Sequence, residues 1–486
     1  MKKVISIILA ISILLVSAIP AFAGSKAHDP DECENVPVIV VRGMDFAGLY
    51  VDYGTENEKP ILDVDVPQLL LKLAGVFANL SFFRTDEAID IVINYAYNLL
   101  KYLTIDENGD SLYNIGQPKY TEGAGNYQEL VEGEFNELGM ARACIENFGG
   151  DHTYYLNYDW RLDPFVVADE INTLVETAVK ETGHKKVSIV CASMGGIMTL
   201  AYLTKYGYDK IERCLFMSST LFGAQVASDL LNGRVSIEAD NLYNFLNYQI
   251  KNKDKPVVEE LCGFLNDIGG FDFLTEITDF ILEYYYDDIY DRILKPIFGH
   301  MLSLWGLVQP EDYESAIDFM LGGRNAENAD FLKRADRLQA MMAGRDKLLN
   351  KMINSGVKIA IVSNYNSPLT PFNESADWNG DGTLETVNTS GYATVAKYGE
   401  TLGDDYVAKN PKYLSPDRIV DLSTAHFPKY TYAIKDAPHV SCRYGSDYSD
   451  FMIWLLTYDG EFYAGASSKY PQFMVSGYDQ NFRTAK

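Results

Sequence analysis

Ser193 lies where the pattern of the chain changes most abruptly, and it is the side chain best placed to act as a nucleophile. The residues from Val187 to Cys191 are typical of a buried parallel strand, and apolar residues at helical spacing follow as far as about Tyr206. A strand that turns directly into a helix strains its central residue and needs small neighbours. Gly195 meets this need, whereas Cys191 stands where glycine is usual. The turn predicts a nucleophile elbow beside the free N–H groups of a helix start, although a buried serine at a strand end fits the same five residues.

A serine nucleophile needs a base to take its proton and an acid to orient that base. His439 follows the last predicted strand and precedes a predicted helix, which is where a base is expected in folds with a serine elbow. Asp404 lies between the serine and the histidine in the chain, and Asp405 is the alternative acid. We therefore predict Ser193, Asp404 and His439 as a catalytic triad. A loop histidine bonded only to backbone is the other interpretation of His439.

Two backbone N–H groups are predicted to bind the negative charge that develops on the substrate oxygen. Met194 directly follows the serine, so its N–H belongs to the helix start. Met44 follows the apolar run 36–41 and a glycine, the place of a first oxyanion loop. An ordinary strand-to-loop turn accounts equally well for the residues around Met44.

The elements that would hold these residues alternate between strand and helix, which predicts an α/β fold with a mostly parallel central sheet. A helical insertion is expected at about 50–150, and a helical, aromatic-rich stretch at 227–354 is expected to be an inserted cap. The two parts of the core are then 24–226 and 355–486. The predicted core strands are 36–41, 153–158, 187–191, 213–217, 357–362 and 430–434.

Residues 1–23 combine Lys2 and Lys3, an apolar run and small residues up to Ala23, which predicts a secretory signal peptide and a secreted protein. No later run is long and apolar enough to span a bilayer, so no transmembrane segment is expected after signal removal. The formal net charge of −27 disfavours nucleic acid and anionic membranes as partners. Six scattered cysteines show no metal spacing, and a Cys33–Cys144 disulfide is one possible pairing.

Three motifs together resemble the lecithin:cholesterol acyltransferase-like branch of the α/β-hydrolases: Tyr158-Asp159-Trp160-Arg161, Ala192-Ser193-Met194-Gly195-Gly196 and Gly403-Asp404-Asp405-Tyr406-Val407. The resemblance implies the α/β-hydrolase fold, a lipid ester substrate, a serine–histidine–aspartate triad and no cofactor for the chemistry, and the acidic net charge adds that the lipid or other ester substrate should be neutral. The leading hypothesis is therefore a secreted serine lipase or esterase. A lipid O-acyltransferase with the same triad and a non-catalytic surface-binding homologue are the alternatives.

A possible structural calcium site is predicted separately, in the loop that follows strand 357–362. The spacing of oxygen-bearing side chains and glycines there follows the first eight positions of a calcium loop, while position 12 has Asn instead of the usual bidentate Glu. An Asn/Asp/Gly turn without an ion is the alternative. The six predicted ligands are Asp377, Asn379, Asp381, Thr383, Glu385 and Asn388.

Overall fold

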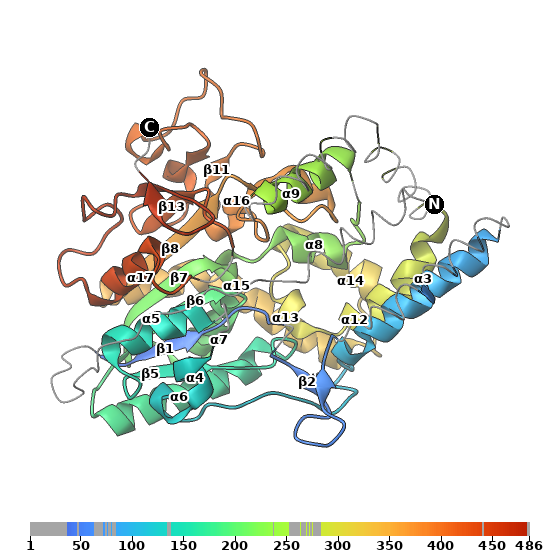
Figure 1. Cartoon of the computed structure of the whole chain (residues 1–486), viewed down its shortest axis with the longest axis horizontal. Helices are drawn as coiled ribbons and strands as arrows, with labels where there is room; N and C mark the ends of the chain where they lie inside the picture. The colour runs from blue at the N-terminus through green and yellow to red at the C-terminus, as the bar shows by residue number, and fades with distance from the viewer. Residues whose placement is uncertain are drawn as a thin grey trace.

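The computed structural model describes residues 36–483, apart from most of 63–83 and 252–282 and from 46–47, 134–137, 237 and 440–441. The predicted signal peptide and Cys33 lie outside the described residues. At the centre is an eight-stranded sheet in the order β15-β14-β13-β8-β7-β6-β1-β5 (Figure 1). Neighbouring strands are parallel except for the pair β14–β15. The α/β class with a mostly parallel central sheet is thus confirmed. The strands are β1 (Val38–Val41), β5 (Thr153–Leu156), β6 (Val187–Ser193), β7 (Ile211–Ser219), β8 (Lys358–Tyr365), β13 (Thr431–Lys435), β14 (Phe473–Ser476) and β15 (Phe482–Arg483).

The central strands are apolar on both faces, because helices cover the sheet on both sides. In β1, Ile39 and Val41 enter one hydrophobic cluster while Val38 and Val40 enter the other. The first cluster is shared with α6 (Pro164–Thr182), α7 (Gly195–Tyr206) and α15 (Ala329–Asn354), and the second with α5 (Gly139–Phe148) and α17 (Asp447–Thr457). Figure 1 shows α5 and α17 together in front of the strands.

The stretch between β1 and β5, where a helical insertion is predicted, contains a small sheet as well as helices. Its strands β2 (Tyr50–Val51), β3 (Lys59–Pro60) and β4 (Ile115–Gly116) pair in the order β3-β2-β4. The helix α3 (Thr85–Leu100) projects to the right in Figure 1 and is followed by the short helices η2 (Lys101–Leu103), η3 (Ala124–Asn126) and α4 (Gln128–Glu132).

Helices occupy the described part of the long excursion between β7 and β8, where the cap is predicted. The last of them, α15, packs against α7 and β8 and contributes Leu338 and Leu349 to the core. The helices that precede α15 in this excursion are called the cap helices, or the cap, below. They are η5 (Thr220–Phe222), α8 (Gln225–Leu231), α9 (Ala239–Lys251), the π-helical η6 (Tyr290–Leu294), α12 (Lys295–Phe298), α13 (Leu302–Trp305), η7 (Pro310–Asp312) and α14 (Tyr313–Leu321).

The chain between β8 and β13 forms short elements instead of a single helix. Its first part, residues 366–385, is called the acid loop below. It contains β9 (Ser367–Pro368), η8 (Glu374–Asp377) and β10 (Asn379–Gly380), and β9 and β10 pair antiparallel. The later elements are α16 (Thr386–Thr389), β11 (Thr394–Val395), η9 (Pro411–Tyr413), β12 (Val420–Asp421) and η10 (Leu422–Thr424).

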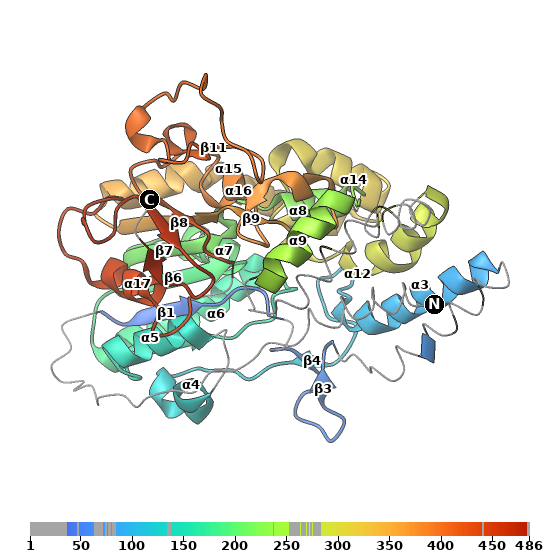
Figure 2. The ribbon, with the colours of Figure 1, turned by 45° about the horizontal axis from the view of Figure 1, so that its top comes forward.

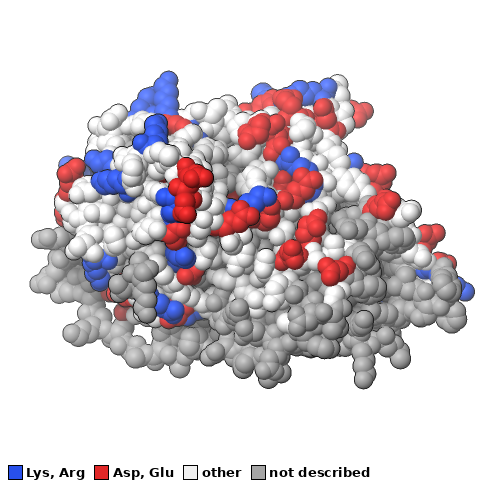
Figure 3. All heavy atoms as spheres, turned by 90° about the horizontal axis from the view of Figure 1, so that it is seen from above, with Lys and Arg blue, Asp and Glu red and all other residues white. Residues whose placement is uncertain are grey.

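The surface carries the acidic excess of the composition. Carboxylates gather in the right half of the face shown in Figure 3, with Lys and Arg interspersed among them. In the part of the chain that the structure describes, no helix combines the length and the hydropathy that crossing a membrane requires.

Candidate active site

Ser193 ends β6 and has a left-handed backbone conformation, with φ of +50°. An L-residue rarely adopts this conformation, and α7 begins only two residues later, so the turn is a strained elbow as predicted. A side chain at Gly195 could not be accommodated, because a Cβ atom there would lie 2.6 Å from the carbonyl oxygens of Val41 and Arg42. Cys191 replaces the usual glycine without conflict, since its side chain is fully buried in the core cluster that contains α7.

His439 lies directly beside this serine. Its Nε2 is 2.9 Å from Ser193 Oγ, and the two residues are 246 positions apart in the sequence. The side chain is largely buried, with 17% of its surface exposed. The loop after β13 thus carries the predicted base to the predicted nucleophile, at hydrogen-bonding distance.

The acid beside His439 is Asp381, so the prediction of Asp404 is wrong. Asp381 Oδ2 lies 2.8 Å from His439 Nδ1, and the backbone N–H of His439 donates to the carbonyl of Asp381 at 2.7 Å. Asp381 is 1% exposed, whereas Asp404 and the alternative Asp405 are exposed. The physical reason is position: Asp381 lies on the acid loop, which directly follows β8, while Asp404 lies beyond β11 in a later excursion where Arg418 holds its backbone carbonyl.

The local structure of the acid loop fixes the orientation of the Asp381 carboxylate. Its Oδ1 accepts hydrogen bonds from the backbone N–H groups of Thr383 at 3.0 Å and Leu384 at 2.8 Å, which leaves Oδ2 to face the histidine. Because a carboxylate can only accept, Nδ1 of His439 carries the proton and Nε2 is left as the acceptor for the serine hydroxyl. This is the tautomer that a general base requires.

Five of the six predicted calcium ligands pair or hydrogen-bond with protein groups in the structure, and the calcium site stays a prediction. Asp377 pairs with Lys397, Asn379 Oδ1 accepts from the backbone N–H of Asn366 at 2.6 Å, and Asp381 bonds to His439. In addition, Glu385 accepts from the N–H groups of Gln225 and Val226, and the amide of Asn388 donates to the carbonyl of Phe222. Among the described residues, no group of three or more His, Cys, Asp or Glu side chains is arranged to hold a metal ion.

The same residue types are typical both of a calcium loop and of an ordinary turn. An Asp between glycines, followed by Thr, builds a turn in which the carboxylate bonds to backbone N–H groups, whether or not an ion is present. The signal that could have identified Asp381 is its position, because it is on the first polar loop after the strand that follows the cap.

The charges around His439 favour its protonated form. Burial by itself would lower the pKa of His439, but the negative charge of Asp381, the hydrogen bond to it and the charge of Glu385 together raise that pKa above the ordinary histidine value. Glu385 is itself fully buried, and burial raises its pKa to about 7 against the opposing effect of the backbone N–H groups of Glu385 itself, Gln225 and Val226.

The predicted oxyanion residues both have their backbone next to the nucleophile. Met194 follows Ser193 and precedes the first residue of α7. Gly43, directly before Met44, packs so tightly on the serine that a Cβ atom there would lie 2.6 Å from Ser193 Cβ and 3.1 Å from Ser193 Oγ. A glycine is therefore required at 43, and the segment Gly43-Met44 lies alongside the serine hydroxyl.

Side chains of the turn Tyr158-Asp159-Trp160-Arg161 hydrogen-bond to the backbone on either side of the Gly43-Met44 segment. The Tyr158 hydroxyl donates to the carbonyl of Arg42 at 2.9 Å, and Trp160 Nε1 donates to the carbonyl of Asp45 at 3.1 Å. Arg161 is fully buried and forms a bidentate pair with Asp159, at 2.9 and 2.6 Å, which fixes the turn itself. A motif that was singled out by composition thus contacts the predicted oxyanion segment through two long side chains.

The cap contacts the triad through the acid loop. Tyr248 of α9 accepts a hydrogen bond from Ser367 of β9 at 2.7 Å, and α9 lies beside β9 in Figure 2. In the last turn of α8, Asp229 accepts from Asn373 at 2.9 Å and from the Ser375 hydroxyl at 2.7 Å. The cap and the loop that carries Asp381 are therefore joined by buried polar contacts.

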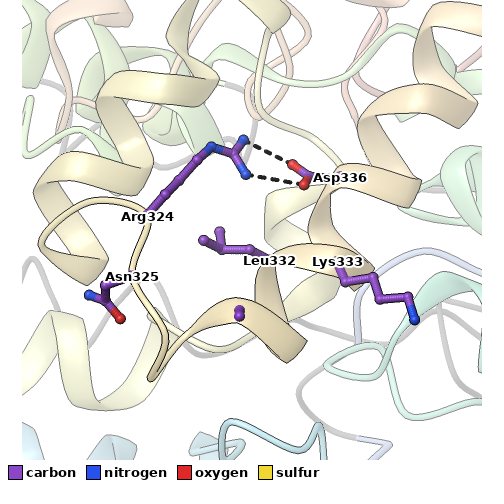
Figure 4. Close-up of a pocket in the computed structure, with 6 residues that line it drawn as sticks. Arg324, Asn325, Leu332, Lys333 and Asp336 are labelled. Carbon is purple, nitrogen blue, oxygen red and sulfur yellow. Dashed lines mark hydrogen bonds and ion pairs between the residues drawn. The ribbon is translucent and has the colours of Figure 1, made fainter.

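A separate hollow on the surface between α14 and α15 does not belong to this site. It is lined by Arg324, Asn325, Ala329, Leu332, Lys333 and Asp336, and none of the triad residues reaches it (Figure 4). Arg324 is the charged group best placed to hold an anion there, but its guanidinium is already bonded to Asp336 and Glu314.

Comparison with known proteins does not identify a family for this chain. No protein-family model matches the chain, and no curated protein matches it. Among solved structures, a chain from the crystal structure of the Tle4–Tli4 complex matches 87% of this chain and 98% of its own length, with 10% sequence identity and a TM-score of 0.34. A likeness at this level carries no argument, so the function must be inferred from the geometry of this chain's own residues.

Proposed function

We propose that this protein is a secreted serine hydrolase that cleaves carboxylic esters of lipids through an acyl-enzyme on Ser193. The observation that carries the proposal is the continuous chain from Ser193 Oγ to His439 Nε2 at 2.9 Å and from His439 Nδ1 to Asp381 Oδ2 at 2.8 Å. A buried carboxylate, an imidazole and a hydroxyl on a strained elbow are the parts that acyl transfer requires.

In the proposed reaction, His439 Nε2 takes the proton of the Ser193 hydroxyl as its oxygen attacks the ester carbonyl carbon. The N–H groups of Met44 and Met194 stabilise the oxyanion of the tetrahedral intermediate. The protonated imidazole, stabilised by Asp381, then donates its proton to the leaving alcohol oxygen, and the acyl group remains on the serine. Water attacks the acyl-enzyme with His439 again as base, which releases the acid and restores the hydroxyl.

The strand order supports an α/β-hydrolase fold for the catalytic core. The six strands β5, β1, β6, β7, β8 and β13 are parallel neighbours in that order. The serine ends β6, the acid follows β8 and the histidine follows β13, which reproduces the chain order serine, aspartate, histidine of that fold. The cap would then be an insertion between the strand after the elbow and the strand before the acid.

The lipid part of the proposal depends on the resemblance of the motifs at 158–161 and 192–196 and on the cap, whose contacts with the acid loop place it beside the triad. Secretion depends on the signal-peptide pattern of residues 1–23. Hydrolysis of p-nitrophenyl esters of increasing acyl length tests the lipid assignment. Turnover that is highest with acetate and falls steadily with length would limit the proposal to a short-chain esterase.

The test of the enzymatic proposal is labelling of the full chain by a fluorophosphonate, which phosphonylates an activated serine. We expect one label per chain, at Ser193, and no label in Ser193→Ala. An unlabelled native protein would favour the non-catalytic surface-binding alternative. The acyltransferase alternative shares the acyl-enzyme step and is tested by adding a long-chain alcohol during turnover of a p-nitrophenyl ester by unlabelled protein and measuring whether a new ester or a free acid is released.

A further inference from the structure

Arg42 is a buried cation beside the nucleophile that the proposed mechanism does not use. It is 3% exposed, and its guanidinium donates through Nε to Asn157 Oδ1 at 2.7 Å and through Nη2 to the carbonyl of Tyr158 at 2.8 Å. Its third bond, from Nη1, goes to the carbonyl of Gly43 at 2.9 Å. The carboxylate of Asp45 lies 3.9 Å from Nη1. A charge that is costly to bury is thus directed mainly at backbone carbonyls.

The hydrogen bond from Arg42 to the carbonyl of Gly43 holds the peptide that carries the predicted oxyanion donor, the N–H of Met44. The carbonyl of Gly43 and the N–H of Met44 belong to one peptide unit, and this unit is trans. In a planar trans peptide the C=O and the N–H point in opposite directions. A guanidinium fixed on the carbonyl oxygen therefore directs the Met44 N–H away from itself.

Because residue 43 is a glycine, the orientation of the Gly43–Met44 peptide depends on hydrogen bonds from other residues. Gly43 must lack a side chain because it packs on Ser193, but the absence of a Cβ leaves its backbone dihedrals only weakly restricted. Without a hold on its carbonyl, the Gly43–Met44 peptide could rotate and remove its N–H from the reacting oxygen. The neighbouring carbonyls of Arg42 and Asp45 are held by Tyr158 and Trp160, so the segment is bonded on both sides of this peptide.

We propose that Arg42 is a positioning residue for the oxyanion hole, which fixes the Gly43–Met44 peptide so that the Met44 N–H is aimed at the substrate oxygen over Ser193. This inference rests on the proposed hydrolase function. The charge on the guanidinium also polarises the peptide that it bonds to, which makes the Met44 N–H a stronger donor. Arg42 itself does not touch the substrate.

The test compares Arg42→Met with Arg213→Met in the full chain. Arg213 is a matched control, because it is equally buried, bonds to the carbonyls of Leu455 and Tyr458 and to Asp459, and lies on β7 at the opposite end from the elbow. Both variants are expected to lower the melting temperature. Only Arg42→Met is expected to lower kcat for a p-nitrophenyl ester, by about 10- to 100-fold. This loss is smaller than the roughly 10²–10³-fold that follows complete removal of an oxyanion donor, because the Met44 N–H is still present.

The second measurement is the inhibition constant of a trifluoromethyl ketone, whose carbonyl carbon is attacked by the serine so that its oxygen becomes an oxyanion. A purely structural role of Arg42 would leave this inhibition constant unchanged. The inhibition constant should rise in Arg42→Met in proportion to the fall in kcat/KM, with KM within about twofold. If Arg42→Met does not fold, Tyr158→Phe is the second variant, because it removes the hydrogen bond from the Tyr158 hydroxyl to the same segment. It should lower kcat about 3- to 10-fold, less than Arg42→Met, by the same loss of oxyanion stabilisation.

Equal effects of the two arginine variants on kcat, or an unchanged inhibition constant in Arg42→Met, would overturn the positioning role. A native protein that hydrolyses no ester and takes up no fluorophosphonate would instead overturn the proposed function, and the role of Arg42 with it.

Discussion

Replacing Asp381 by Asn is the sharpest test of the triad, because the structure dictates how the new side chain would lie. Oδ1 accepts hydrogen bonds from two backbone N–H groups, so the amide oxygen of the Asn must take that place. The amide NH₂ then faces His439 Nδ1, 2.8 Å away in the native protein, and donates to it. An imidazole that accepts at Nδ1 carries its proton on Nε2, which faces the Ser193 hydroxyl and can no longer take its proton.

The expected loss is large and confined to chemistry. Reversing the tautomer in a serine triad lowers kcat about 10⁴-fold, and at about 1.4 kcal/mol for each factor of ten this is roughly 5 kcal/mol of transition-state stabilisation. The fold should be preserved, because the shape of the side chain and both bonds at Oδ1 are retained, so we expect the free energy of unfolding to change by less than about 1 kcal/mol.

The assay is the steady-state hydrolysis of a p-nitrophenyl ester, with the melting temperature measured in parallel. Asp404→Asn is the matched control: it makes the same chemical change on an exposed residue, and we expect kcat within about twofold of the native value. The reasoning is refuted if Asp381→Asn retains most of the activity, or if Asp404→Asn is the variant that loses it.

Three further predictions concern the base, its titration and calcium. We expect His439→Ala to lower kcat by about three orders of magnitude or more while His426→Ala, an exposed residue paired with Asp346, stays near the native value; similar losses in the two variants would contradict the assignment. We expect kcat/KM to fall on acidification with an apparent pKa above the ordinary histidine value of 6.5, because Asp381 and Glu385 raise the pKa of His439 and the protonated ring is no base; a midpoint below 6.5 would show that burial dominates instead. We expect a calcium chelator to leave the melting temperature unchanged, because the predicted ligands already bond to protein groups; a fall of several degrees, reversed by calcium, would show that the acid loop binds the ion in another arrangement.

The sequence alone was sufficient for the parts of the site that local sterics and chain order control. The elbow at Ser193 could be predicted because a strand that turns directly into a helix tolerates only small neighbours, and Gly195 meets that demand in one short stretch. His439 could be predicted because it follows the last strand predicted for the parallel core, and the carboxyl ends of parallel strands meet at one edge of the sheet. The α/β class follows from the same alternation of strand and helix.

The tertiary structure decided which carboxylate faces His439 and which groups Arg42 contacts. Asp381 and Asp404 both lie in polar, glycine-containing loops, and nothing local distinguishes a carboxylate that faces solvent from one that faces an imidazole 58 residues further along the chain. Likewise, the sequence around Arg42 shows only a basic residue after a predicted strand. Its hydrogen-bond partners could not be predicted, because Asn157 and Tyr158 lie more than a hundred residues away. A strand, a turn or a cap is specified by neighbours in the chain, whereas a hydrogen bond between distant loops depends on how the whole sheet brings their ends together.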